Sequence, residues 1–127
     1  MIDSVLHIVL CQPEIPPNTG NIIRLCANVG VALHVIKPIG FEMDDKRLRR
    51  AGLDYHEFAD VQIWDSLPAY VDAHAARRLI AVETCGEVAH SDLTYQPDDS
   101  LVFGSETKGL SYELLTLFDP SHIARLP

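Results

Sequence analysis

The sequence predicts an α/β fold in which helices flank both faces of a mostly parallel β-sheet. Short apolar runs typical of buried strands alternate along the chain with longer amphipathic segments typical of helices. Polar turns that contain glycine follow two of the apolar runs directly, at residues 12–21 and 104–109. Ligands of α/β domains bind outside the carboxyl ends of the strands, so these turns form the candidate site. No repeat or linker interrupts the 127 residues, and we expect a single domain over residues 1–127.

The first strand and the first helix are expected on either side of a proline-rich loop. Residues 5–11 form a nearly continuous apolar run, and three prolines follow that run within six residues. The first helix is expected to begin at Asn18 or Thr19, because either side chain can cap it. A broad apolar face follows, and the helix is expected to stop at Gly30.

The middle of the chain continues the alternation. Residues 32–36 are apolar and predict a strand, and residues 45–50 predict a short helix that starts with acidic residues. A further strand is expected at 61–64, followed by a helix that Asp65 or Ser66 caps and that reaches about residue 76. The remaining elements are buried parallel strands at 79–83 and 101–103, a helix at 110–118 and a last strand at 122–126.

Composition excludes several classes of protein. The chain is 47% hydrophobic and 22% charged, which is ordinary for a globular domain, and no apolar run approaches the roughly 18 residues of a membrane span. We therefore expect a cytoplasmic protein with no membrane partner. The three cysteines are far apart and the six histidines never occur at a ligand-like spacing, so we expect neither a disulfide nor a metal site.

Charge is distributed unevenly along the chain. The net charge of −8 by itself opposes binding to a polyanion, because phosphate contacts need Lys and Arg. Residues 1–50, however, hold six Lys or Arg and five Asp or Glu, whereas residues 51–127 hold four and thirteen. Four of the six basic residues of the first half form one cluster: Lys46, Arg47, Arg49 and Arg50. This cluster is either a solvated helix face or a surface that binds RNA.

The turn after the strand at 101–103 contains two glycines, Gly104 and Gly109. Their spacing is that of a phosphate-binding loop, but Lys108 precedes the second glycine and no Lys-Ser or Lys-Thr pair follows it, which excludes a nucleoside triphosphatase. Two interpretations remain. The segment is either a plain strand-to-helix turn in which glycine supplies a positive φ, or a place where a ligand approaches the backbone closely.

The first helix carries three amides and one guanidinium near its start, from Asn18, Asn21, Arg24 and Asn28. A helix-capping role accounts well for the position of Asn18 near the helix start but poorly for that of Arg24. An arginine beside several amides is suited to bind a phosphate or ribose in bidentate fashion. A guanidinium keeps its proton at any ordinary pH, so Arg24 can bind such a group but cannot act as a base.

At these residues the sequence resembles the SPOUT-class RNA methyltransferases. The run Ile-Pro-x-Asn-Thr-Gly-Asn-Ile-x-Arg matches residues 15–24, and the run Phe-Gly-x-Glu-x-x-Gly-Leu matches residues 103–110. Residues 44–56 are similar in particular to the TrmL type, which methylates the ribose 2′-hydroxyl of the tRNA wobble nucleotide. Family members continue past the position of residue 127 into a third motif and a last helix, which form a knot. The resemblance therefore implies an α/β-knot fold whose knot-forming segment this chain does not contain.

The resemblance also implies roles for individual residues. It implies S-adenosylmethionine as methyl donor, tRNA as partner, a homodimer, and no DNA partner and no metal. The matching catalytic residues are Arg24 and Asn18. The matching donor-binding residues are Val82, Gly104, Glu106, Gly109 and Leu126. The residues expected to contact RNA are Lys46, Arg47, Arg49, Arg50 and His56.

A second function stays open at this point. Without the third motif, the domain could be a noncatalytic RNA-binding or dimer-forming remnant of the same fold. Sequence alone does not distinguish this remnant from a 2′-O-methyltransferase that acts on cytidine or uridine 34.

Overall fold

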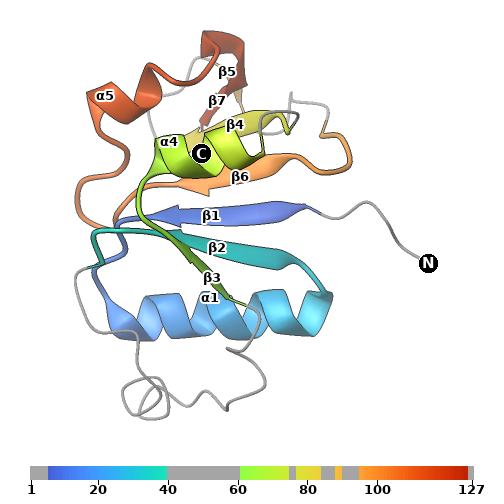
Figure 1. Cartoon of the computed structure of the whole chain (residues 1–127), viewed down its shortest axis with the longest axis vertical. Helices are drawn as coiled ribbons and strands as arrows, with labels where there is room; N and C mark the ends of the chain where they lie inside the picture. Colours follow the sequence, from blue (N-terminus) through green and yellow to red (C-terminus); the bar gives the residue numbers. More distant parts are fainter. Residues whose placement is uncertain (1–5, 40–60, 75–76, 84–87, 90–94, 126–127) are drawn as a thin grey trace.

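The computed structural model describes residues 6–39, 61–74, 77–83, 88–89 and 95–125. They form a parallel sheet with helices on both faces, which confirms the predicted α/β class (Figure 1). The strands are β1 (His7–Cys11), β2 (Ala32–Ile36), β3 (Gln62–Trp64), β4 (Leu79–Glu83), β5 (Val88–Ala89), β6 (Ser100–Phe103) and β7 (Ile123–Arg125). The helices are α1 (Pro16–Val29), α4 (Leu67–Ala73), α5 (Tyr112–Leu115) and the 3₁₀ helix η2 (Pro120–His122). None of the helices in these ranges is long and apolar enough to cross a membrane.

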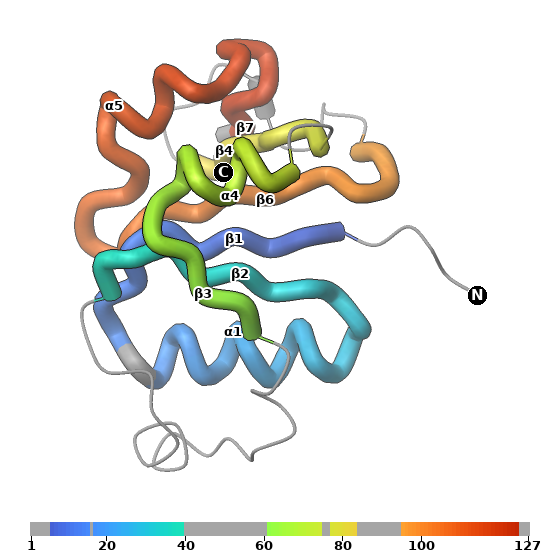
Figure 2. The backbone as a smooth tube through the Cα atoms, in the orientation of Figure 1, coloured from blue at the N-terminus to red at the C-terminus, as the bar shows by residue number. Residues whose placement is uncertain are grey.

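Strands β1 and β6 lie side by side inside the sheet, and β6 is the middle strand. The strand order is β3-β2-β1-β6-β4-β7-β5, so β3 and β5 are the edge strands. His7 lies opposite Ala32 of β2 and Ser100 of β6, and both pairings are parallel. Figure 2 shows the resulting path, in which the late strand β6 lies beside the first strand. All carboxyl ends of the strands therefore lie along one edge of the sheet, as a parallel arrangement requires.

Two apolar clusters hold the layers together. Successive side chains of a strand point to opposite faces, so neighbouring residues of β1 enter different clusters. On one face Leu10 packs with Ile23 of α1 and Val35 of β2. On the other face Val9 packs with Tyr70 of α4, and the cluster extends to Phe118 beyond α5.

Helix α1 begins two residues before the predicted start. Its N-cap is Ile15, which makes no side-chain capping bond, and Pro16 occupies the first helical turn. The expectation that Asn18 or Thr19 caps the helix is therefore wrong. Proline has no N–H to satisfy and its φ is already helical, which allows the earlier start. The predicted end is confirmed, since Gly30 has φ 76° and its N–H donates to the carbonyl of Cys26.

Other element boundaries also differ from the prediction. Helix α5 spans one turn instead of residues 110–118, because Ser111 caps its start and the chain leaves the helix at Thr116. Helix α4 is capped by Ser66, as expected, but ends at Ala73 instead of residue 76. The short strand β5 was not predicted, and residues 120–122 form η2 ahead of β7. The helix expected at 45–50 lies outside the described residues.

Histidines that are far apart in the sequence meet on the α4 face of the sheet. His34 is only 2% exposed, and its Nδ1 accepts a hydrogen bond of 3.0 Å from the indole Nε1–H of Trp64. Its Nε2 lies 3.3 Å from Nδ1 of His7, so His34 donates to His7 when both rings are neutral. Burial lowers the pKa of His34 to about 4 and also lowers the pKa of His7. Within the described ranges, no cluster of His, Cys, Asp or Glu could hold a metal ion.

These neutral histidines predict a loss of stability in mild acid. The unfolded chain binds a proton at His34 near pH 6.5, whereas the folded protein resists protonation down to about pH 4. The free energy of unfolding is then expected to fall by roughly 2–3 kcal/mol as the pH decreases through this window. Urea denaturation at several pH values would measure the fall. His34→Asn keeps an acceptor for Trp64 but does not titrate, so its stability should depend less steeply on pH; an equal slope would contradict the assignment.

Candidate functional site

Two loops meet at the carboxyl ends of β1 and β6. The first loop, residues 12–15, joins β1 to α1, and the second, residues 104–110, follows β6. The chain turns sharply at Gln12, which has φ 56° and donates its N–H to the carbonyl of Ile36. The parallel pairing of β1 with β6 ends at Leu10 and Phe103, so both loops start from the same level of the sheet. The two candidate segments of the sequence therefore lie side by side.

The second loop folds back on itself. Ser105 and Gly109 form an isolated bridge, and the N–H of Gly109 donates to the carbonyl of Ser105 at 2.9 Å. A Cβ at position 104 would overlap the backbone of Gly109 and Leu110. Gly104 is therefore required by the close approach of the loop's own backbone, whereas one interpretation of the sequence assigned that closeness to a ligand.

Glu83, the last residue of β4, supports the second loop. Its Oε1 accepts the backbone N–H of Leu110 at 2.7 Å. Gly109 has φ 67°, and a Cβ there would lie 2.9 Å from Oε2 of Glu83. Both the conformation and the neighbouring carboxylate therefore require glycine at position 109. Glu83 was not predicted from the sequence, although a carboxylate at the end of a buried strand itself indicates a candidate site residue.

Two carboxylates connect the first loop to the second. Oε1 of Glu106 accepts the N–H of Glu14 at 2.9 Å, and its Oε2 accepts the N–H of Ile15 at 2.6 Å. In the other direction, Oε1 of Glu14 accepts the hydroxyl of Thr107 at 2.7 Å and the N–H of Thr107 at 3.2 Å. We call these four residues, Glu14, Ile15, Glu106 and Thr107, the clasp. The hydrogen bonds from the Thr107 side chain and backbone lower the pKa of Glu14, so its carboxylate is ionised at neutral pH.

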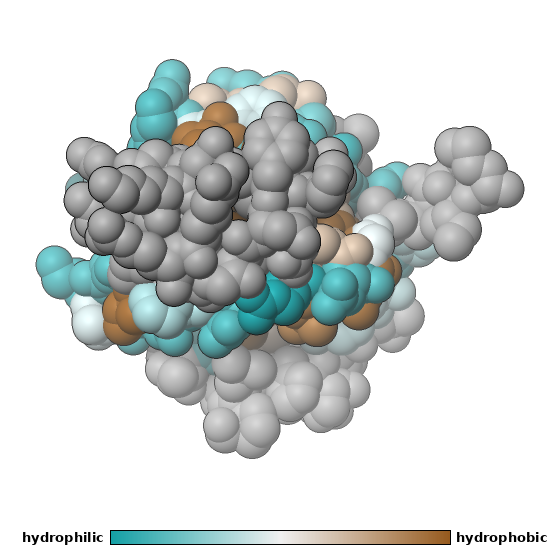
Figure 3. Space-filling model, turned by 90° about the horizontal axis from the view of Figure 1, so that it is seen from below, coloured by the Kyte–Doolittle hydropathy of each residue, from teal (hydrophilic) through white to brown (hydrophobic). Residues whose placement is uncertain are grey.

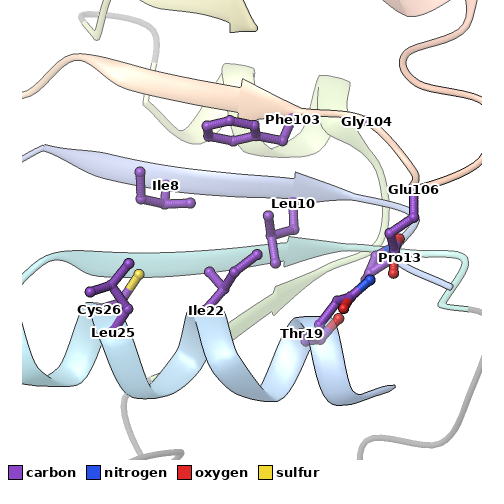
Figure 4. A pocket seen from close by; sticks show the side chains of 11 residues that line it. Ile8, Leu10, Pro13, Thr19, Ile22, Leu25, Cys26, Phe103, Gly104 and Glu106 are labelled. Carbon is purple, nitrogen blue, oxygen red and sulfur yellow. The ribbon is translucent and has the colours of Figure 1, made fainter. Parts of the chain in front are cut away.

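A cavity of about 400 Å³ opens beside the clasp, between α1 and strands β1 and β6 (Figure 4). Its wall is apolar and is formed by Ile8, Leu10, Ile22, Leu25, Cys26 and Phe103. Polar groups and a glycine lie at the end nearest the carboxyl ends of the strands: Asn18, Thr19, Gly104 and Glu106. This size falls within the range of about 300–1,000 Å³ of small-molecule sites. The cavity is lined by residues of both sequence motifs.

The predicted donor-binding residues lie at neighbouring strand ends. In the sheet register, Val82 of β4 pairs with Phe103 of β6, one residue before Gly104. Val82 also pairs with Ala124 of β7, two residues before the position of Leu126. Leu126 itself lies outside the described residues. Glu106 uses both carboxylate oxygens in the clasp, so a role toward the methyl donor stays a prediction.

The residues predicted for catalysis both lie on α1. Asn18 is exposed at the first turn and lines the cavity. Arg24 is half-buried further along the same helix. The residues predicted to contact RNA lie outside the described residues: Lys46, Arg47, Arg49, Arg50 and His56.

The two motifs and their arrangement match a known family. The pattern that defines the SpoU rRNA methylase family matches residues 5–127, nearly the whole chain. The chain belongs to the SpoU rRNA methylase family. This result confirms the family that the runs at 15–24 and 103–110 predicted.

Relatives of this SpoU methylase chain carry a specific activity in their names. The tRNA (cytidine(34)-2′-O)-methyltransferase of Methylovorus glucosotrophus is 55% identical over 97% of the chain and 80% of its own length. The protein of the same name from Escherichia coli strain K12 is 54% identical over 97% of the chain and 78% of its own length.

Solved structures agree with the fold of this SpoU methylase. A structure concerned with the 2-OH methylation of C/U34 on tRNA superposes with a TM-score of 0.87 at 38% identity. The match covers 98% of the chain and 80% of the chain in that structure. The SpoU methyltransferase AviRb of Streptomyces viridochromogenes, solved with AdoMet, superposes with a TM-score of 0.78 at 25% identity. The match covers 100% of the chain and 50% of the AviRb chain.

The glycines of this SpoU methylase offer a matched pair of substitutions. Gly30→Ala places a Cβ in open space and costs only the left-handed φ, about 1 kcal/mol. Gly104→Ala forces the backbone of Gly109 and Leu110 to move, so we expect a loss of about 3 kcal/mol or more together with loss of donor binding. Urea denaturation and calorimetry with S-adenosylmethionine would measure both effects. Equal stability of the two variants would show that the second loop tolerates a side chain at position 104.

Proposed function

We propose that this chain transfers a methyl group from S-adenosylmethionine to the ribose 2′-hydroxyl of a tRNA nucleotide, the wobble cytidine or uridine 34. The observation that carries the proposal is the identity of 54–55% to relatives named for this reaction, over 97% of the chain. The site supports it, because the two family motifs line one cavity at the carboxyl edge of a parallel sheet.

The reaction needs little chemistry from the protein. The sulfonium of the donor supplies an electrophilic methyl group, the ribose oxygen forms the new C–O bond as the C–S bond breaks, and S-adenosylhomocysteine leaves. The hydroxyl proton passes to a neighbouring phosphate or to water. Catalysis then depends chiefly on in-line alignment of the attacking oxygen, for which well-oriented reactants gain several orders of magnitude in rate.

Arg24 and Asn18 are the residues of α1 to which we assign this alignment. Arg24 keeps its proton, so it can bind a phosphate and the ribose oxygen through two N–H groups but cannot act as a base. Asn18 presents an amide at the polar end of the cavity. Val82, Gly104 and Gly109 are assigned to the donor side, since they lie at or after the ends of β4 and β6.

We further propose a cytoplasmic homodimer that docks tRNA through the basic cluster at 46–50 and His56. Two apolar side chains of α1, Leu25 and Val29, are each 60% exposed and lie four residues apart, so they share one side of the helix. Figure 3 shows the molecule from below, and hydrophobic patches alternate there with hydrophilic ones. An interface between two copies would bury such patches.

A direct assay tests the proposed function. The full natural protein is incubated with S-adenosylmethionine and a tRNA that carries cytidine or uridine at position 34. Mass spectrometry of the nuclease digest should find one 2′-O-methylated nucleotide, and a tRNA with a 2′-deoxy nucleotide at position 34 should acquire none. Binding of tRNA without methylation would favour the noncatalytic remnant instead.

Arg24→Ala should separate chemistry from donor binding. We expect methyl transfer to fall at least a hundredfold, about 2.7 kcal/mol, with donor affinity nearly unchanged, because the proposed partners of Arg24 are groups of the RNA. Single-turnover rates and calorimetry would measure the two effects. Arg24→Lys keeps the positive charge but loses the planar guanidinium, so its rate should lie between that of the wild type and that of Arg24→Ala. A rate within about threefold of wild type in Arg24→Ala would exclude an essential role.

The basic cluster should determine the salt dependence of tRNA binding. Each phosphate contact that a substitution removes is expected to lower the slope of log affinity against log salt by a little under one unit. Joint replacement of Lys46, Arg47, Arg49 and Arg50 by alanine should therefore flatten the dependence, whereas donor affinity, the control, should not change. Filter binding at several salt concentrations gives the slope. An unaltered slope would mean that the cluster is a solvated helix face.

A further inference from the structure

The clasp joins the two halves of the proposed site across 91 to 93 residues of sequence. We propose that Glu14 is a positioning residue for methyl transfer, which holds the second loop in register with α1 through its bonds to Thr107. This inference rests on the proposed function.

The clasp links two segments of the proposed site that lie far apart in the sequence. Ile15, whose N–H is held by Glu106, is the N-cap of α1, so the clasp fixes the end of the helix that carries Asn18 and Arg24. Thr107, held by Glu14, lies three residues after Gly104 in the loop assigned to the donor. The clasp is therefore a direct link between the segment assigned to the ribose and the segment assigned to the donor.

The clasp lies at the surface, outside the apolar core. Glu106 and Thr107 are exposed, and neither apolar cluster of the described core includes a clasp residue. Hydrogen bonds at the surface add little to global stability, because water replaces them readily. Alignment is more sensitive, since a displacement of about 1 Å between reacting groups can reduce a rate by about a hundredfold. Loss of the clasp should thus affect the chemical step far more than folding.

The two glutamates of the clasp use their oxygen atoms differently. Glu14 accepts two bonds from Thr107 through a single atom, Oε1, and the side chain of Ser105 also forms a hydrogen bond with Glu14. A glutamine at position 14 retains one carbonyl oxygen and can accept both bonds from Thr107. Glu106 instead uses both oxygens, one for each backbone N–H. A glutamine at position 106 would direct its NH₂ group at an N–H, so it cannot replace the glutamate.

The test compares five single variants of the full natural protein: Glu14→Ala, Glu14→Gln, Glu106→Gln, Thr107→Val and Thr107→Ser. Single-turnover methylation is measured at saturating tRNA and S-adenosylmethionine, and the dissociation constants of both are measured separately. We expect Glu14→Ala to lower the rate about tenfold while both dissociation constants stay within about twofold. Glu14→Gln should keep the rate within about twofold, and Glu106→Gln should lose about as much as Glu14→Ala.

Thr107→Val removes the hydroxyl donor without touching either glutamate, and Thr107→Ser is its matched control. If Glu14 acts through Thr107, the double variant Glu14→Ala, Thr107→Val should be no slower than Glu14→Ala alone. A wild-type rate in Glu14→Ala, or equal losses in Glu14→Ala and Glu14→Gln, would overturn the inference. Absence of methylation by the wild-type protein would instead refute the proposed function, so the two failures are distinguishable.

Discussion

The parallel pairing of β1 with β6 is the constraint on which the site depends. It places the carboxyl ends of two strands side by side although about ninety residues separate them in the sequence. The loops that leave these ends are irregular and largely polar, and of their residues only Leu110 belongs to an apolar cluster of the described core. Their positions follow from the sheet register, which the buried side chains of β1 and β6 fix through packing. The chemistry of the site is thus carried by loops whose placement the core determines.

Three carboxylates hold the loops of the site in the positions that the sheet register gives them. Glu83, Glu106 and Glu14 each accept backbone N–H groups of a loop that no strand could satisfy. Backbone donors left without a partner are costly, and an ionised carboxylate is a strong acceptor for them. Part of the acidic excess in the second half of the chain, Glu83 and Glu106, therefore stabilises the loops of the site.

Sequence patterns predicted the sheet better than the helix ends or the site contacts. Apolar runs identified six of the strands, most clearly β1, β2 and β4, because burial on both faces leaves a direct compositional trace. The start of α1 was mistaken, since Pro16 made a side-chain cap unnecessary, and the two-residue β5 is too short to leave a pattern. At the site, the glycines were identified, but neither interpretation of the sequence included the loop's own backbone, which approaches Gly104 closely. The partners of Glu14 could not be found, because they come from a loop that only the folded sheet brings near.

The outer strands of the sheet have a consequence for solubility. The edges are β3, with three residues, and β5, with two, whereas the strands between them that meet the candidate site have four or five. An open edge presents unpaired N–H and C=O groups to which another chain can add a strand, and a short edge offers few of them. Although Ile63 of β3 is 45% exposed, so brief an edge gives a neighbouring molecule little to pair with. Within the described residues, the apolar, parallel centre of the sheet is therefore bounded on each side by a strand that offers few groups for pairing with another chain.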